Sequence, residues 1–368
     1  MPTPTPMRIC NLSLLFVLMA LPLTAQPSPE QSAQQSSAPP AADKTPAQAP
    51  SLTVDRDPVR SPDGEPAAPP VLRKEGDGYV LHTDVDEVAL NCTVLDGNRM
   101  VPDLKKENFQ ILEDGIRQKI ISFQHTDLPV SIALVVDNSG SMARKRPSVN
   151  KSTLDLISAS NPQDEAFVVN FSDEAFIDQD FTSDVNLLRA GLSHIEARGG
   201  TALYDAVAAS ADKLATDAKR PKQVIILITD GDDNASTLNL EQTVRRVQLL
   251  SGPVIYTIGL LFGEEDMSRD EVKNARKALK QLSDETGGMA FFPKNIEQID
   301  EIAAEVARDI RNQYTLGYHS TKPATDLGFR RVEVTAEGKG KSKLIVRTRT
   351  GYYPVTRVVK QVAVPDKK

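Results

Sequence analysis

The residues of this chain that are best suited to chemistry lie in one short segment, residues 137–141 (DNSGS). Its spacing places one carboxylate, Asp137, and two hydroxyls, Ser139 and Ser141, on a single tight loop. The loop follows the apolar run 132–136, which is typical of a strand buried on both faces. Mg²⁺ prefers about six oxygen ligands, accepts only one or two carboxylates and keeps several waters. These three side chains therefore predict ligands for a hard divalent cation.

Two more segments carry oxygen-bearing side chains at predicted strand ends. Thr201 follows two glycines and precedes a predicted helix, and Asp230 closes the apolar run 224–228. Open α/β sheets bind ligands at the carboxyl ends of their strands. We therefore expect Thr201 and Asp230 to face the same crevice as the 137–141 loop. The alternative for these segments is purely structural, since Ser-Gly-Ser can cap a helix and Asp-Gly can form a turn.

Taken together, the three segments resemble the metal-ion-dependent adhesion site of von Willebrand factor A (VWA) domains. Asp137, Ser139 and Ser141 match the first motif of that site, Thr201 the second and Asp230 the third. The resemblance covers about residues 130–315. It implies one bound Mg²⁺, or Mn²⁺ or Ca²⁺ in its place, with one coordination position left for an acidic residue of a protein partner.

The flanking segments also resemble an acidobacterial family of secreted proteins related to the VWA domain. The similarity lies in residues 109–115 (FQILEDG), 313–318 (QYTLGY) and 351–353 (GYY). That family has little assigned biochemistry. The resemblance therefore informs architecture and export more than activity.

The resulting functional prediction is an exported module that binds a protein partner through its metal and is not an enzyme. A metal-assisted hydrolase is a weaker alternative. It would need a general base or a second metal beside the first, and no histidine, lysine or spare carboxylate is obviously placed for that role. A non-catalytic envelope scaffold with a structural or vestigial metal site is the other alternative.

Other polar residues suggest weaker roles. The basic run 144–146 (RKR) is predicted mainly as a solvated face, with a rim that attracts an acidic partner as the alternative. Asp232 and Asp233 are expected to be exposed loop charges, with tuning of the metal as the alternative. Cys92 lies in a strand pattern and is expected to be a small buried apolar residue. The four histidines are far apart in sequence, and none has a zinc-like partner nearby.

Strands and helices alternate through the middle of the chain. Apolar runs predict strands at 132–136, 166–171, 224–228 and 254–261, with an antiparallel edge strand at 176–181 and helices at 201–215, 240–250, 270–286 and 296–311. This pattern predicts an α/β fold with a doubly wound, mostly parallel sheet, VWA-like or Rossmann-like. Strand patterns also lie before and after this region, and one of them predicts a single strand at 116–123. Together they predict a small flanking β-sandwich formed by both flanks.

The predicted domain organisation has six parts. These are a signal peptide (1–25), a disordered linker rich in Pro, Ala, Ser and Gln (26–75), a first β-strand module (76–128), the VWA domain (129–320), further β-strands that complete the module (328–356) and a flexible tail (357–368). We expect export to the periplasm, cell surface or medium, without a transmembrane span after signal cleavage. The sequence does not indicate an oligomeric state.

Composition excludes one broad class of partner. The formal net charge is −7, and the chain contains no tryptophan. Nucleic-acid binding requires a basic surface, and single-stranded binding also uses aromatic stacking. We therefore expect no nucleic-acid partner.

Overall fold

The computed structural model describes most of the chain from Glu87 onward. The described residues are 50–51, 59–60, 87–158, 161–193, 198–250, 252–263, 268–323, 325–338 and 343–354. The predicted signal peptide and tail lie outside them. Of the predicted linker, only the antiparallel pair β1 (Pro50–Ser51) and β2 (Val59–Arg60) is described. In the described part of the chain, no helix is long and apolar enough to cross a membrane.

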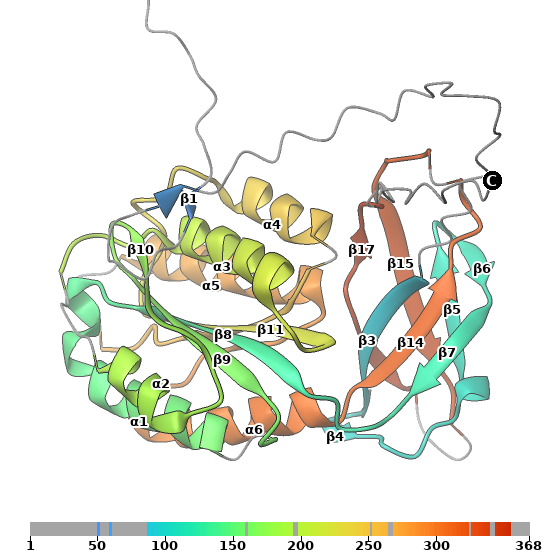
Figure 1. Cartoon of the computed structure of the whole chain (residues 1–368), viewed down its shortest axis with the longest axis horizontal. Helices are drawn as coiled ribbons and strands as arrows, with labels where there is room; N and C mark the ends of the chain where they lie inside the picture. The colour runs from blue at the N-terminus through green and yellow to red at the C-terminus, as the bar shows by residue number, and fades with distance from the viewer. Residues whose placement is uncertain are drawn as a thin grey trace, which may run out of the picture. The chain divides into compact units, whose positions relative to one another are not determined.

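A six-stranded sheet forms the centre of the α/β domain, in the order β10-β9-β8-β11-β12-β13 (Figure 1). The strands are β8 (Val130–Asp137), β9 (Glu165–Phe171), β10 (Ala175–Thr182), β11 (Lys222–Thr229), β12 (Val254–Gly259) and β13 (Ala290–Phe291). Every neighbouring pair is parallel except β10 with β9, at the edge. The predicted mostly parallel α/β sheet with one antiparallel edge strand is confirmed.

Helices cover both faces of this sheet (Figure 1). They are α1 (Arg146–Ser158), α2 (Val185–Leu192), α3 (Leu203–Asp217), α4 (Leu240–Leu249), α5 (Arg269–Thr286) and α6 (Ile299–Arg311). Successive side chains of a strand point to opposite faces. Ile132 and Leu134 accordingly pack with α1, α2 and α6, whereas Ala133 and Val135 pack with α3, α4 and α5. Burial on both faces explains why β8 is a continuous apolar run.

The first two helices are absent from the sequence prediction, while α3 to α6 match the four predicted helices. The buried face of α1 includes Ser152 and Thr153 beside Val149 and Leu156. Polar and apolar residues are therefore mixed on its buried face, which hides the helical period of its apolar residues. The α2 helix has only 8 residues, too few to show such a period clearly.

Strands from both flanks form a second unit of packing, here called the β module. One sheet has the order β16-β3-β14-β7 with β4 paired to β3, and the other has the order β17-β15-β5-β6. Their bounds are β3 (Glu87–Asp96), β4 (Arg99–Met100), β5 (Phe109–Glu113), β6 (Ile116–Gln118), β7 (Ile120–Gln124), β14 (Tyr314–His319), β15 (Arg330–Ala336), β16 (Ile345–Arg347) and β17 (Gly351–Tyr352). Both sheets contribute to one apolar core, which includes the buried thiol of Cys92.

Strand pairing corrects two details of the sequence prediction. A VWA domain that runs to residue 320 would include β14, but β14 pairs with β3 and β7 and buries Tyr314, Leu316 and Tyr318 in the core of the β module. The predicted single strand at 116–123 is two strands. Its first part pairs with β5 and its second with β14, so the chain changes sheets at Lys119.

A buried carboxylate on α6 joins the α/β domain to the β module. Asp309 is fully buried and accepts a hydrogen bond from the Tyr256 hydroxyl of β12 at 2.6 Å. It also accepts one from the Arg347 guanidinium of β16. Nearby, the backbone N–H of Thr350 donates to the carbonyl of Glu285 at 3.2 Å. Asp309 therefore joins α6, β12 and β16 at one point by charge and hydrogen bonding.

We predict that Asp309→Ala lowers the free energy of unfolding by about 3 kcal/mol, because it leaves the Arg347 charge and the Tyr256 hydroxyl without their acceptor. Urea unfolding followed by circular dichroism measures the change. Asp155→Ala is the matched control. Asp155 is 60% exposed and pairs with the exposed Lys151, so its loss should cost less than about 1 kcal/mol. Equal losses in the two variants would contradict this account of the junction.

Candidate metal centre

The loop after β8 is built around the buried carboxylate of Asp137. The side chain has no exposed surface. One of its oxygens, Oδ1, accepts the backbone N–H of Ser139 at 2.8 Å, and the other, Oδ2, accepts the Thr229 hydroxyl of β11 at 2.5 Å. These bonds fix the orientation of the carboxylate at the carboxyl edge of the sheet. Each oxygen keeps a further lone pair, because an ionised carboxylate has about four acceptor sites.

Hydrogen bonds bring the first and third motifs together. The Ser141 hydroxyl donates to Asp230 Oδ1 at 2.8 Å, and the Ser139 and Ser141 hydroxyl oxygens lie 3.2 Å apart. Since a hydroxyl has one proton and that of Ser141 goes to Asp230, Ser139 is the donor in the second contact. Ser139 and Asp230 are buried, whereas Ser141 is exposed. The cluster is therefore open to solvent on the side of Ser141.

The second motif reaches the site because two glycines allow a tight approach. Gly199 has a φ of +81°, and a Cβ there would lie 2.1 Å from a carboxylate oxygen of Asp173. The N–H of Gly200 donates to that carboxylate at 2.6 Å. Thr201 follows, buried, with its hydroxyl oxygen 3.5 Å from the position that a Cβ on Gly231 would take. The Thr201 hydroxyl thus lies beside the residue that follows Asp230.

The capping alternative does not account for these hydroxyls. A short 3₁₀ helix, η2 (Gly140–Arg144), begins after Ser139, and the Ser139 side chain makes no capping hydrogen bond. The residue that caps α3 is Ala202 rather than Thr201. At the start of α3, the N–H of Tyr204 is bonded by the Asp233 carboxylate at 3.1 Å. The motif hydroxyls remain available for a cation.

Burial controls the protonation of Asp137. Desolvation raises the pKa of this carboxyl from 3.8 to about 6, opposed by the hydrogen bonds from Thr229 and Ser139 and reinforced by the negative charge of Asp230. A buried carboxylate with a raised pKa is costly to ionise in the absence of a cation. The environment of Asp137 therefore favours a bound positive charge once the group is ionised.

The sequence pattern predicts that the basic run 144–146 is a solvated face, and this prediction is wrong for two of its three residues. Only Arg144 is exposed. The Lys145 ammonium is 2.8 Å from Asp230 Oδ2, in a pair whose side chains are 10% and 0% exposed. Arg146 is fully buried. Lys145 and Arg146 are oriented inward because the residues around the motif offer acceptors that solvent-facing side chains would not reach.

Arg146 supports the motif loop from inside the domain. Its guanidinium donates to Asn170 Oδ1 at 2.7 Å, to the carbonyl of Leu192 at 3.0 Å and to the carbonyl of Asp137 at 3.5 Å. Burial lowers the pKa of this arginine to about 10, against the attraction of Asp137 and Asp178. Arg146 therefore connects the end of β8 to β9 and α2.

The acidic pair after the third motif is also more buried than the sequence pattern predicts. Asp233 is half-buried and accepts hydrogen bonds from Tyr204 and Ser236, so it helps to fix the start of α3. Desolvation raises the pKa of Asp233 and of its neighbour Asp232. Asp233 has a structural role at this edge, whereas Asp232 lies partly exposed beside the site.

The donor set fits a hard divalent cation better than a soft one. It contains two carboxylates and three hydroxyls, and no group of three or more His, Cys, Asp or Glu side chains occurs among the described residues that could hold a metal. Soft metals prefer thiolate or imidazole, whereas Mg²⁺ and Mn²⁺ accept oxygen ligands and water. The residues that would hold the ion are Asp137, Ser139, Ser141, Thr201 and Asp230.

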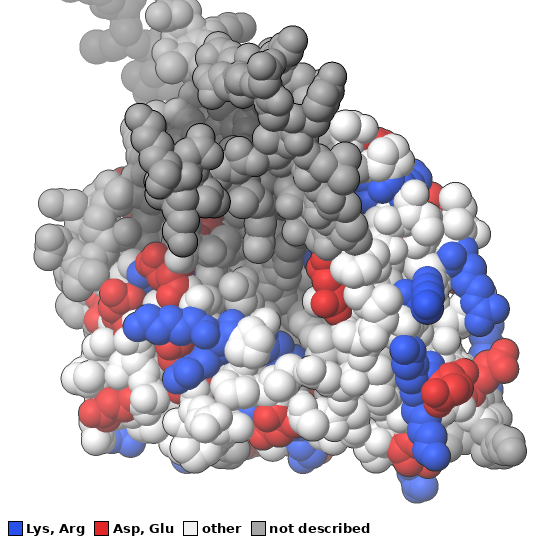
Figure 2. All heavy atoms as spheres, turned by 45° about the vertical axis from the view of Figure 1, so that its right-hand side comes forward, with Lys and Arg blue, Asp and Glu red and all other residues white. Residues whose placement is uncertain are grey.

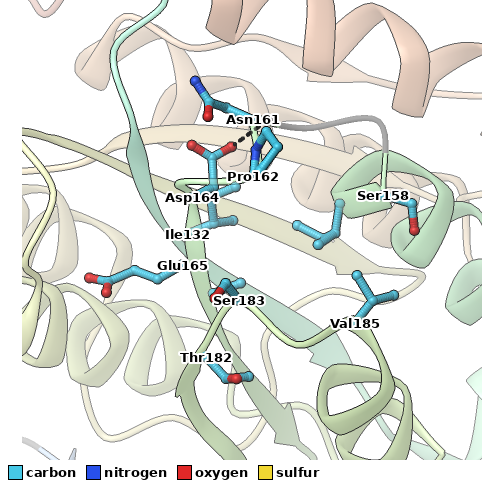
Figure 3. Close-up of a pocket in the computed structure, with 11 residues that line it drawn as sticks. Ile132, Ser158, Asn161, Pro162, Asp164, Glu165, Thr182, Ser183 and Val185 are labelled. Atoms are coloured by element: carbon cyan, nitrogen blue, oxygen red, sulfur yellow. Dashed lines mark hydrogen bonds between the residues drawn. The ribbon is translucent and has the colours of Figure 1, made fainter.

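A cavity of about 290 Å³ lies near the amino ends of β8 and β9, away from the motif loops (Figure 3). Its acidic groups already have partners in the fold. Asp164 accepts from the N–H groups of Val130 at 2.8 Å and Asn161 at 3.2 Å, and Glu165 accepts from the Ser131 hydroxyl at 2.7 Å. These contacts hold the strand starts in place, so the cavity does not compete with the motif cluster as a candidate centre.

Sequence reasoning missed Thr229, Lys145 and Arg146. Thr229 had a usable signal, because its hydroxyl directly follows the apolar run 224–228 and directly precedes Asp230. The two basic residues had none. Their burial depends on acceptors that are remote in sequence, such as Asn170 and Leu192.

Part of the chain matches a known protein family. Residues 132–232 match the family model for the von Willebrand factor type A domain. Inter-alpha-trypsin inhibitor heavy chain H4 is similar in two species: the Bos taurus protein is 28% identical over 134 residues (32% of this chain, 15% of that protein), and the Homo sapiens protein is 25% identical over 265 residues (64% and 27%). The chain thus spans less than a third of the length of either relative.

Among solved structures, a von Willebrand factor type A protein from Catenulispora acidiphila is similar with a TM-score of 0.44 at 13% identity, covering 74% of this chain and 75% of that chain. This likeness is distant. The assignment rests instead on the family model, whose matched region begins in β8 and ends just after Asp230, so that it contains all three motifs. Residues 132–232 therefore belong to a VWA domain.

Proposed function

We propose that the protein binds one divalent cation, Mg²⁺ or in its place Mn²⁺ or Ca²⁺, at Asp137, Ser139, Ser141, Thr201 and Asp230, and uses it to bind a protein partner through an acidic residue. The observation that carries the proposal is the contact between motifs at one sheet edge, with Ser141 Oγ 2.8 Å from Asp230 Oδ1. A bound cation would supply concentrated positive charge beside the exposed hydroxyl of Ser141. A partner carboxylate is the natural further ligand.

Binding is supported better than hydrolysis by the groups around the site. The two motif carboxylates are fully buried, and Lys145 is paired with Asp230. A hydrolase needs a base positioned to activate water, and these groups are engaged in holding the loops. A scaffold role with a purely structural metal is distinguished by the capture experiment below.

The surface charge favours a protein partner over nucleic acid. On the face in Figure 2, lysine and arginine side chains alternate with aspartate, glutamate and uncharged ones. Nucleic-acid binding would favour a continuous basic stripe, and the net charge of the chain is −7. We further propose that the protein is exported, on the basis of the apolar N-terminal segment 12–21 that follows Arg8.

We predict that Ser141→Ala weakens Mg²⁺ binding about tenfold or more, because it removes a hydroxyl ligand and the donor to Asp230. Asp137→Ala should abolish binding. Isothermal titration calorimetry measures both. Ser193→Ala is the matched control, since Ser193 is exposed and its hydroxyl donates to the α2 carbonyl of Arg189. Indistinguishable titrations for wild type, Ser141→Ala and Asp137→Ala would show that these residues do not hold the cation.

Stabilisation by the cation should depend on pH. Asp137 has a pKa of about 6 in the metal-free fold, raised above its ordinary 3.8. The fold therefore gains stability from protonating Asp137 as pH falls through 6, and a cation must displace that proton. We predict that a concentration of Mg²⁺ about 100-fold above its Kd stabilises the protein by about 2.7 kcal/mol at about pH 7.5.

At about pH 5 the same Mg²⁺ concentration should stabilise the protein only about half as much, because apparent affinity falls about tenfold per pH unit below the pKa. Thermal unfolding at both pH values, with and without Mg²⁺, measures the difference. A melting-temperature shift equally large at both pH values would indicate that the cation binds without deprotonating Asp137.

The partner prediction is tested by capture from the native envelope with immobilised protein. Partners should be retained with Mg²⁺, released by a chelator, and absent from Ser141→Ala resin but present on Ser193→Ala resin. Proteins retained equally with and without chelator would instead favour the scaffold function.

A further inference from the structure

The junction between the α/β domain and the β module is built from polar groups of both units. Asp309 Oδ2 accepts hydrogen bonds from the Tyr256 hydroxyl at 2.6 Å and from the Arg347 guanidinium. The Tyr256 oxygen in turn accepts one from Gln313 Nε2 at 3.1 Å. Gln313 lies where the chain passes from α6 to β14. These side chains therefore form one connected network at the crossing between the two units.

Thr93 of β3 belongs to the same place. Its neighbour Cys92 points into the core of the β module, so Thr93 points to the opposite face of the sheet. Thr93 is paired directly with Arg347, and the register that pairs Cys92 with Tyr314 brings Gln313 next to Thr93. Because Thr93 is only 1% exposed on this outer face, the junction buries it.

Four buried atoms at this place have no hydrogen-bond partner among the described residues. They are Thr93 Oγ1, Asp309 Oδ1, Gln313 Oε1 and Arg347 Nε. The orientation of the glutamine amide is fixed, because the Tyr256 proton goes to Asp309 and the tyrosine oxygen can then only accept from the NH₂ group of Gln313. A buried polar group without a partner costs its full desolvation free energy. Four such atoms at one place therefore indicate a shared partner.

We propose that one ordered water molecule is buried at this junction and is bound by these four atoms. Asp309 Oδ1 and Gln313 Oε1 only accept hydrogen bonds, Arg347 Nε only donates, and a threonine hydroxyl does either. Water both donates and accepts, so it matches this mixed set. A metal cation would leave the Arg347 N–H without an acceptor and would lie beside the guanidinium charge. Buried waters in proteins make about three hydrogen bonds to groups that are otherwise unpaired.

The water adds a third component to the junction. Asp309 lies on α6, Thr93 on β3 and Arg347 on β16, so a single molecule bonds the α/β domain to two strands of the β module. Ordered water that bridges two polar groups is nearly as favourable in enthalpy as a direct hydrogen bond. This site is separate from the proposed cation site and does not depend on it.

Urea unfolding of the full chain with Thr93→Val tests the site, because valine keeps the shape of threonine and lacks the hydroxyl. We expect the unfolding equilibrium constant to rise about fivefold, because the variant loses a hydrogen bond to the water. A hydroxyl without any partner gives the opposite sign, since its removal ends a desolvation cost. An unfolding constant that is unchanged or lower in Thr93→Val would overturn the proposal.

Thr335→Val is the matched control for the change of side chain itself. Thr335 lies on β15 of the same module, and its side chain is exposed. Its unfolding constant should change by less than about twofold, as is usual for surface positions.

Crystals of the wild-type chain supply a direct readout that does not depend on how the variant folds. We expect one peak of solvent density at about 2.7–3.2 Å from Asp309 Oδ1 and Gln313 Oε1. A peak at about 2.0–2.6 Å from these oxygens would identify a cation instead of water. That result, or well-ordered side chains with no peak between them, would overturn the proposal.

Discussion

Two carboxylates buried at one edge of a sheet are the constraint on which the rest of this structure depends. Asp137 and Asp230 have no exposed surface, and an unpaired buried charge costs several kcal/mol. The fold offsets that cost with donors from separate elements: a backbone N–H, the hydroxyls of Thr229 and Ser141, and the ammonium of Lys145. Each donor also attaches a loop to the cluster, so the same contacts that compensate the charge shape the site.

The parallel sheet explains why these groups meet. The strands β8 and β11 are adjacent and parallel, and their register places Val136 opposite Ile228. Asp137 and Thr229 therefore follow at the same level, close enough for the hydroxyl to donate to the carboxylate. The second motif, which carries Thr201, reaches this edge in a different way. Gly199 has a left-handed backbone conformation and lies against Asp173. A side chain at position 199 would collide with the Asp173 carboxylate.

The sheet and the motif cluster were predictable from sequence because both depend on local patterns. Continuous apolar runs mark strands buried on both faces, and the carboxyl ends of parallel strands share an edge. The burial of Lys145 and Arg146 was not predictable, since a basic run has the same composition on a surface or beneath a loop. The sequence also did not predict whether β14 belongs to the α/β domain or to the β module. The alternation of Tyr314, Leu316 and Tyr318 is compatible with both, and only the pairing of β14 with β3 assigns the strand to the β module.

Anomalous X-ray diffraction from crystals grown with Mn²⁺ tests the central claim most directly. Mn²⁺ is preferred because it accepts the same oxygen ligands as Mg²⁺ and scatters anomalously. We predict one strong peak bounded by the Ser139, Ser141 and Thr201 hydroxyls and the carboxylates of Asp137 and Asp230. Crystals with a well-ordered motif cluster but no peak there, or with a peak at another set of side chains, would contradict the account.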